Sequence, residues 1–442
     1  MGRRVVVLVQ EEEPWFRYIW QQFVQINSLI TENIVINYSE YTYNKNDFIL
    51  EYGNKQMFPN SIFIPSRKKF KTDDYVWKRD DLPVYRDTIS DDGKYDIFYN
   101  AFVHLSRLEE WESEIRKRYI NSYSYKHPRK NKRIWKIPVV NYLFNELESL
   151  IKSKFPSVVF GGKEKPYIEF SHDVDYIKKT LQARIKQSAF HMINFFRFLL
   201  QGKFQKSILK LKKAITFAIR NTNYWCFDCW DELESRFNIR SVYYIFVKAN
   251  KDFSLRKFIL DPSYDITKND KLKVKCKELI SKGNKIGLHG SYFSSVSEEL
   301  FRREKETLEN IIGQEIKKSR QHWLNYYETK TPYILQNVGI EEDSTIAFND
   351  ISGFRAGVAS IYNPYDHRNS KPFSFKEIPM VIMDSHLFDY SDDYETWNIG
   401  WFFDVLKKVK NVGISLNWHE RVISPDYGWH VAYEKIIKSI KE

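Results

Sequence analysis

The sequence predicts an α/β protein whose larger, C-terminal part is built from parallel strands joined by crossover helices, either closed into a barrel or open as a doubly wound sheet. The first observation is a series of short apolar segments after residue 166 that alternate with helical stretches such as 297–313. The second is that polar side chains follow many of these segments, as they do at the carboxyl ends of barrel strands. The expected strands are 167–171, 241–247, 285–289, 319–323, 344–348, 377–383 and 411–418.

Residues 1–155 are predicted to form a smaller α/β accessory domain that precedes the barrel at 156–442. An apolar strand at 5–9 opens this part, and short strands and basic loops follow it. No group of catalytic residue types gathers here, so we expect the chemistry to lie in the barrel. Helical spacing of apolar residues predicts helices over 13–29, 95–111 and 139–152.

The composition is that of a folded protein in a reducing compartment. The chain has 442 residues, enough for two or three domains with hydrophobic cores, and its 17% aromatic content argues against disorder. Three cysteines do not make a disulfide framework. The apolar run at 5–9 is too short for a signal peptide, and no uncharged apolar run reaches the roughly 20 residues that span a bilayer. We therefore expect a cytoplasmic protein.

Positive charge is concentrated in the segment 177–220, within a helical insertion predicted over 177–222. The segment carries eleven Lys and Arg residues and no Asp or Glu, which nearly equals the net charge of +12 for the whole chain. Two interpretations are open: a helical hairpin packed on the barrel with a solvated basic side, or an interfacial helix pair on an anionic membrane. The second would make the protein peripheral to the inner membrane. Nucleic-acid binding would rest on charge alone and is not expected.

The stretch 167–175 carries the main catalytic signal. An apolar strand runs into Ser171-His-Asp-Val-Asp175, where Asp173 and Asp175 are two residues apart and point to the same face of an extended chain. Two adjacent carboxylates repel, and a divalent cation or a shared proton relieves that repulsion. One could bind a metal while the other stays free as a base; the alternative is a strand end with an Asx-turn. Polar residues near the other strand ends are His289, Arg320, His322, Asp343, Asp384, His386 and His419.

These segments resemble the motifs of the NodB-like polysaccharide deacetylases, a carbohydrate esterase family 4-like group. The resemblance covers about 165–430 and implies a distorted (β/α)7 barrel with a divalent metal, usually zinc. The N-terminal part is similar to the domain that precedes this barrel in an uncharacterised bacterial branch. The matching motifs are Ser171-His-Asp-Val-Asp175, Ile286-Gly-Leu-His-Gly-Ser-Tyr292, Ser319-Arg-Gln-His-Trp323, Val338-Gly-Ile-Glu-Glu-Asp-Ser344, Gly353-Phe-Arg-Ala-Gly357 and Leu416-Asn-Trp-His419.

The resemblance also implies roles for individual residues. It makes Asp173 the catalytic base, braced by Arg320, and His419 the general acid that protonates the leaving amine. It makes Asp175 and His289 metal ligands. The family's second metal histidine, four residues after the first, is replaced by Phe293. We expect His322, two residues past Arg320, to supply the missing ligand; otherwise two ligands remain and metal binding is in doubt.

The expected function is a metal-dependent carbohydrate N-deacetylase that removes acetyl from an N-acetylated sugar of a surface-polysaccharide precursor, with zinc as the cofactor. The alternative is a catalytically inactive barrel that binds glycan or an anionic membrane surface. Tyr292 and Trp418 are candidates for stacking on a sugar ring, with plain packing as the alternative. Asp343 and Arg355, in motifs that resemble a later part of the active-site wall, complete the expected substrate-binding residues.

Overall fold

The computed structural model describes residues 4–11, 13–249, 255–389 and 399–441. The chain divides into two compact units: Met1–Glu169 with Leu324–Leu416, and Phe170–Trp323 with Asn417–Glu442. Strands and helices alternate along the chain in both units, which confirms the α/β class. The boundary expected between 155 and 156 stays a prediction.

The N-terminal part of the first unit is a four-stranded parallel sheet in the order β2-β1-β3-β4. All five residues of β1 are buried, and helix α1 buries an apolar face that includes Phe16, Ile19 and Phe23. Pro14 starts α1, where its missing N–H has no helical acceptor to lose. The bounds are β1 Val5–Val9, α1 Pro14–Ile26, β2 Asn33–Asn37, β3 Phe48–Gly53 and β4 Ile62–Pro65.

The single helix expected over 95–111 is two helices, α2 (Ile97–Leu105) and α3 (Leu108–Ile115). Asp96 caps α2 by accepting a 2.8 Å hydrogen bond from the Tyr99 amide. The break falls at Arg107, whose φ of 53° lies in the left-handed region that a continuous α-helix excludes. Its buried guanidinium donates to Glu328 at 2.7 Å within the same unit. The prediction of one helix was therefore wrong: the backbone turns at Arg107, whose side chain pairs with Glu328.

The segment 344–348, expected as a strand, is irregular, and the neighbouring strand β11 is only Glu342–Asp343. Side chains take the place of a strand partner here. The Thr345 amide donates to Asp343 Oδ2 at 3.1 Å, and the Ile346 amide donates to Glu377 Oε1 at 2.8 Å. The remaining main elements of this unit are α4 Val139–Lys154, α11 Thr331–Asn337, β14 Lys376–Glu377, β15 Met380–Met383, α12 Asp384–Phe388 and α13 Gly400–Lys408.

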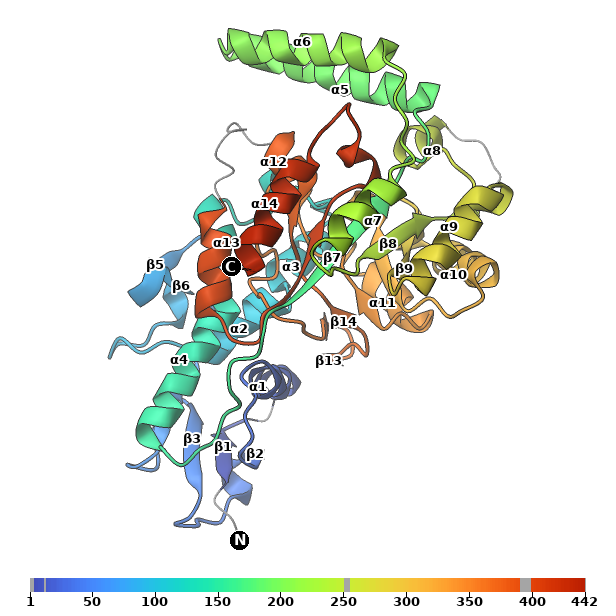
Figure 1. Ribbon diagram of the computed structural model, residues 1–442. Helices are drawn as coiled ribbons and strands as arrows, with labels where there is room; N and C mark the ends of the chain where they lie inside the picture. Colours follow the sequence, from blue (N-terminus) through green and yellow to red (C-terminus); the bar gives the residue numbers. More distant parts are fainter. Residues whose placement is uncertain (1–3, 12, 250–254, 390–398, 442) are drawn as a thin grey trace. The chain divides into compact units, whose positions relative to one another are not determined.

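The second unit contains four neighbouring parallel strands in the order β10-β9-β8-β7. Helices α9 and α10 contact β9, as expected for crossover connections (Figure 1). Because the strands are parallel, their carboxyl ends lie at one edge. The bounds are β7 Tyr167–Val174, α7 Phe227–Ser235, β8 Val242–Phe246, α8 Leu255–Leu260, α9 Asp270–Ser281, β9 Lys285–Gly290, α10 Glu298–Ile312, β10 Lys318–Gln321 and α14 His430–Lys441. Strand β16, Gly413–Asn417, belongs to the first unit except for its last residue.

The basic insertion is a helical hairpin of α5 (Leu181–Leu200) and α6 (Phe204–Ile219), which lie side by side (Figure 1). The Thr180 hydroxyl accepts from the Ala183 amide at 3.2 Å and caps α5. Gly202, with a φ of 69°, allows the tight reversal between the helices. None of the helices in the described part of the chain has the length and apolar content needed to cross a bilayer.

Helix α3 is held in the first unit by buried ion pairs. Glu110 binds Arg355 through two contacts, at 3.0 Å to Nε and 2.6 Å to an Nη, and His127 lies 3.3 Å from it. Both Glu110 and Arg355 are almost fully buried. A guanidinium left alone in such a place is costly because neither water nor a counterion replaces the carboxylate.

Replacing Glu110 by alanine is therefore expected to lower the free energy of unfolding by about 3–5 kcal/mol. The matched control is Glu112→Ala on the same helix, since Glu112 and its partner Arg116 are both exposed and such pairs contribute about 0–1 kcal/mol. Urea unfolding followed by circular dichroism measures both. Equal midpoints for the two variants would contradict a structural role for the Glu110–Arg355 pair.

Candidate metal centre

The carboxyl ends of the second unit's strands bring the predicted polar residues into one buried group. Asp173 is the second-to-last residue of β7, and Asp175 directly follows the strand. His289 comes from the end of β9, and Arg320 and His322 from the end of β10 and the residues after it. His419 follows β16 and approaches the same group. Residues from four separate places in the sequence thus meet at one edge, as parallel strands require.

Three ligand atoms in this group have the spacing of a tetrahedral metal site. His289 Nε2 lies 3.0 Å from His322 Nδ1. Each of these nitrogens lies 3.4 Å from Oδ1 of Asp175. Ligands bound at zinc distances in a tetrahedral arrangement stand about 3.3–3.5 Å apart. The two 3.4 Å separations match this value and the nitrogen–nitrogen separation is slightly shorter, so the group fits a divalent ion such as zinc, held by Asp175, His289 and His322.

Two main-chain carbonyls determine which imidazole nitrogens carry the protons. His289 Nδ1 lies 3.0 Å from the Arg320 carbonyl oxygen, and His322 Nε2 lies 2.9 Å from the Leu260 carbonyl oxygen. A carbonyl oxygen only accepts, so both nitrogens must donate. In the neutral rings, His289 Nε2 and His322 Nδ1 are then bare lone pairs that face each other. This is the arrangement by which outer-shell carbonyls orient metal-binding histidines.

The surroundings of the site shift the pKa values of its candidate metal-binding side chains. Burial lowers the pKa of His322 to about 3, so the ring is neutral at physiological pH. Burial alone would raise the pKa of Asp175, but the groups around it, among them the Arg421 guanidinium, outweigh burial and hold that pKa well below its usual range. Asp175 Oδ1 is buried without a hydrogen-bond partner among the described residues. When both rings are neutral, two lone pairs and a carboxylate oxygen converge here with no proton between them.

Asp173, the predicted base, is held on both oxygens. Arg320 donates to Oδ1 at 2.9 Å and Asn417 donates to Oδ2 at 3.0 Å. Arg320 is itself fully buried, donates to the Ser171 hydroxyl at 2.8 Å and lies over the ring of Tyr244. Burial would raise the pKa of Asp173, but Arg320 and the nearby histidines reverse the effect and lower it. Asp173 is therefore an oriented, ionised carboxylate at neutral pH.

Two contacts of the group had not been predicted. Arg421 donates to Asp175 Oδ2 at 2.8 Å, on the oxygen that does not face the histidine pair. His419 Nε2 lies 3.4 Å from the same oxygen. Arg421 and Asn417 each lie two residues from His419, so the motif around His419 could have drawn attention to them. Their alignment depends on the turn after β16, which no local pattern predicts.

The candidate sugar-stacking residues differ in exposure. Trp418 is fully buried: its indole nitrogen donates to the Trp429 carbonyl at 3.1 Å, and its ring packs on Tyr433. No face of that ring is exposed for a sugar, so packing, the alternative considered for Trp418, describes it. Tyr292 is partly exposed, and its amide donates to Asp261 at 2.8 Å.

His172 points away from Asp173, as the strand alternation predicts. Its Nδ1 lies 2.7 Å from the Trp418 carbonyl oxygen, and its Nε2 lies 3.0 Å from Glu234. Both ring nitrogens are thus engaged on the helix side of β7. His172 is therefore part of the core and not of the group around Asp175.

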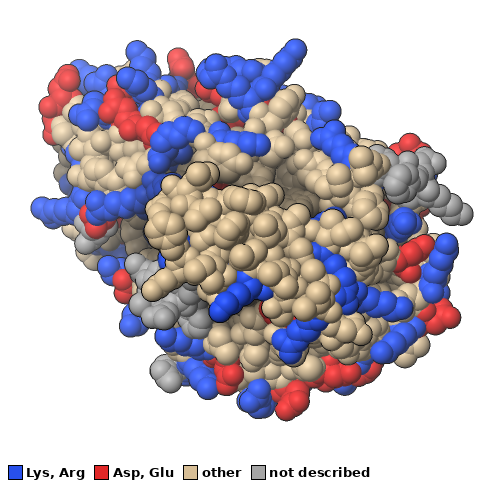
Figure 2. Space-filling view, turned by 90° about the horizontal axis from the view of Figure 1, so that it is seen from above, with Lys and Arg blue, Asp and Glu red and all other residues tan. Residues whose placement is uncertain are grey.

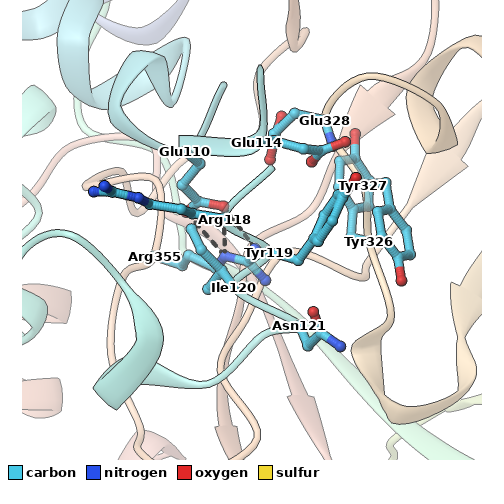
Figure 3. Close-up of a pocket in the computed structure, with 10 residues that line it drawn as sticks. All are labelled: Glu110, Glu114, Arg118, Tyr119, Ile120, Asn121, Tyr326, Tyr327, Glu328 and Arg355. Atoms are coloured by element: carbon cyan, nitrogen blue, oxygen red, sulfur yellow. Dashed lines mark hydrogen bonds and ion pairs between the residues drawn. The ribbon is translucent and has the colours of Figure 1, made fainter. Parts of the chain in front are cut away.

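Arg355 and Asp343 belong to the first unit, where their observed partners are structural. Arg355 binds Glu110, and its other Nη donates to the Ser122 hydroxyl at 2.6 Å. His386, also in this unit, lies 2.7 Å from the Phe348 carbonyl oxygen. Figure 3 shows Arg355 and Glu110 in the wall of a small polar pocket. The pocket is lined by Glu110, Glu114, Arg118, Tyr119, Ile120, Asn121, Tyr326, Tyr327, Glu328 and Arg355.

Comparison with known proteins gives a family model for the N-terminal part only. Residues 5–156 match the model described as "Family of unknown function (DUF7033)". No curated protein matches the chain.

Solved structures similar to this chain include carbohydrate esterase family 4 (CE4) proteins. A putative polysaccharide deacetylase from Mycobacterium smegmatis is 14% identical, with 64% of this chain and 86% of that one covered and a TM-score of 0.36. A CE4 family pseudoenzyme from Bacillus anthracis is 8% identical over 64% and 63% of the two chains, with a TM-score of 0.29. The Bc1960 peptidoglycan N-acetylglucosamine deacetylase is 12% identical over 64% and 84%, with a TM-score of 0.29. Because these TM-scores lie below 0.5, the likenesses say nothing about what this chain does.

Replacing Arg320 by methionine is expected to destabilise the metal-free protein by about 3–5 kcal/mol at pH 7, because the buried Asp173 carboxylate loses its counterion. In the wild type the lowered pKa of Asp173 stabilises the fold above the ordinary value of 3.8 and the effect is lost below it. In the variant, burial raises that pKa, so stability is regained as the pH falls from 7 towards 4.

The difference in unfolding free energy between wild type and Arg320→Met should therefore be largest at pH 7 and shrink on acidification. Urea unfolding in the presence of a chelator, at several pH values, measures it. Arg302→Met is the control, because Arg302 and its partner Glu298 are both exposed on α10. A pH-independent difference would mean that Arg320 does not act through the charge of Asp173.

Proposed function

We propose that this protein is a metal-dependent carbohydrate N-deacetylase that removes acetyl from an N-acetylated sugar of a surface-polysaccharide precursor. The observation that carries the proposal is the convergence of Asp175 Oδ1 with the imidazole nitrogens of His289 and His322 that face away from main-chain carbonyls, beside the ionised carboxylate of Asp173. Metal-assisted hydrolysis of an amide uses a bound metal ion and an adjacent ionised base, and this site can supply both. The motif resemblance supplies the substrate class.

The ligand set indicates zinc, because one carboxylate and two imidazoles leave a tetrahedral ion one position for water or substrate. When bound there, such an ion would polarise the acetamide carbonyl and acidify water. Phe293 stands where the family has its second metal histidine, and His322 on the next strand would serve in its place. The carbonyls of Arg320 and Leu260 keep both rings in the required tautomer.

The chain's own residues divide the proton transfers between them. Asp173 accepts the proton of the attacking water, and Arg320 and Asn417 keep its carboxylate ionised and oriented for that step. His419, whose side chain is partly open to solvent, donates a proton to the leaving amine. Arg421 neutralises Asp175 Oδ2 and leaves Oδ1 for the ion. The products are acetate and an amino sugar.

A second candidate is an inactive barrel that binds glycan without hydrolysis. Arg421 favours it, because a guanidinium 2.8 Å from Asp175 already supplies a positive charge to that carboxylate. In that case the protein would take up no stoichiometric metal. Metal analysis therefore separates the two candidates before any substrate is known.

Chelator-treated protein is expected to bind one equivalent of Zn²⁺ or Co²⁺. His322→Ala and Asp175→Ala should each weaken that binding by more than the roughly 10–100-fold that follows the loss of an outer-shell partner. His430→Ala, a partly exposed histidine on α14 in the same unit, should bind as the wild type does. Calorimetric titration and the cobalt absorption spectrum measure the change. Equal binding by wild type and His322→Ala would remove His322 from the site.

Asp173→Asn is expected to bind the metal normally and to lose about 10²–10⁴-fold in turnover, because the variant lacks the base but keeps the shape of the side chain. Acetate release from a panel of N-acetylated sugars, with and without chelator, measures it. His430→Ala is again the control. Full activity of Asp173→Asn, or activity that survives complete metal removal, would refute the proposed mechanism.

A further inference from the structure

The α5–α6 hairpin buries several polar side chains and exposes many large apolar ones. The side chains it buries include polar residues at positions where a packed hairpin would place apolar ones, and one of them, Lys210, is almost inaccessible. Its exposed positions carry large apolar residues instead, up to 89% exposed at Leu200 and 75% at Ile219. Water is a poor environment for such a surface, because apolar patches of this extent are rare on isolated soluble proteins. The exposed apolar residues are Leu181, Ile185, Ile193, Phe196, Leu199, Leu200, Phe204, Ile208, Leu209, Ile215 and Ile219.

The apolar surface continues onto a neighbouring part of the same unit. Helix α8 also exposes apolar side chains, those of Leu255, Phe258 and Ile259. Figure 2 shows a broad area without charged residues, edged and interrupted by Lys and Arg. The segment 177–220 contributes eleven cations and no carboxylate. An apolar surface with a purely cationic border complements the interface of a bilayer that contains anionic lipids.

The base of the hairpin is connected to the candidate metal centre. Gln182 on α5 donates to the Phe258 carbonyl of α8. Two residues along, the Leu260 carbonyl accepts from His322 Nε2 at 2.9 Å and from the Trp323 indole at 3.0 Å. Trp323 is 41% exposed, and tryptophan favours the boundary between lipid and water. The proposed surface thus continues to within one residue of a metal ligand.

We propose that the exposed face of α5, α6 and α8 is a docking surface for an anionic lipid bilayer. The hairpin lies in the plane of the interface, with its apolar side chains in the acyl boundary and its Lys and Arg side chains among the lipid phosphates. A second copy of this chain is a poorer occupant, because a two-fold contact would bring exposed cations of the segment, including Arg197, Lys212 and Arg220, against their counterparts with no carboxylate from the segment between them. This inference does not depend on the proposed enzymatic activity.

The test is co-sedimentation of the full chain with vesicles of phosphatidylcholine, with and without phosphatidylglycerol. Wild type should bind the anionic vesicles at least tenfold more tightly than the neutral ones, and added salt should weaken that binding. Substituting three exposed apolar residues together, Ile193→Asp, Leu200→Asp and Phe204→Asp, should lower binding at least tenfold. Since all three are exposed, the fold is not expected to change, and circular dichroism checks this.

The matched control combines Val274→Asp and Val431→Asp, exposed apolar residues of the same unit outside the docking surface, and should bind as the wild type does. A charge variant, Lys212→Gln with Arg220→Gln, should lose preference for phosphatidylglycerol while it keeps the apolar face. The proposal is overturned if wild type ignores anionic vesicles at low salt, or if the triple variant binds as well as the wild type. It is also overturned if, without lipid, the wild type forms a dimer that the triple variant does not form. Because no step measures deacetylation, a failure here leaves the proposed activity untouched.

Discussion

The candidate site depends on three buried acceptor atoms, from Asp175, His289 and His322, that lie close together. Two imidazoles donate their only N–H groups outwards to main-chain carbonyls, so the nitrogens that face each other across 3.0 Å have lone pairs and nothing to share. Oδ1 of Asp175, beside them, is also a buried acceptor without a hydrogen-bond donor among the described residues. Buried acceptors that lack a donor are costly, and a cation satisfies all three at once. The other features of the site are arranged around that requirement.

The two oxygens of Asp175 divide the electrostatics of the site. Oδ1 faces the histidine pair, whereas Oδ2 faces Arg421 and His419. Asp173 has its own counterion in Arg320. Two carboxylates two residues apart can therefore both stay ionised and still differ in role, because a different arginine compensates each one. The same fixed partners make each one dependent on a residue distant in sequence.

Part of this arrangement could be predicted from the sequence. Strand alternation placed Asp173 and Asp175 on one face and His172 on the other, and the parallel strand order brought His289 and His322 to the same edge. The roles proposed for these residues are not yet tested. Arg421 could not be predicted in the same way, because its approach to Asp175 depends on the turn after β16. The burial of Trp418 depends on packing against Tyr433, which no local sequence pattern predicts.

For the helices, too, the local sequence predicts the element but not its tertiary contacts. Apolar spacing predicted the helices of the insertion, and in the second helix it placed five residues on one face: Leu211 and four others, Phe204, Ile208, Ile215 and Ile219. It could not say whether that face would be covered, and the structure leaves these four side chains exposed. Likewise, periodicity continued through Arg107, while a buried ion pair with Glu328 turned the backbone there. Periodicity identifies a face, but tertiary partners decide what that face meets.

The outward hydrogen bonds of His289 and His322 both end on main-chain oxygens. A carboxylate or amide partner in those places could be deleted by one codon change, but the carbonyls of residues 260 and 320 survive any side-chain replacement. Evolution can therefore vary Leu260 freely in chemistry without disturbing the protonation pattern of a ligand, provided that the backbone path is kept. A mutational scan of side chains would find no outer partner for His322 at Leu260, although one is present in every variant that folds.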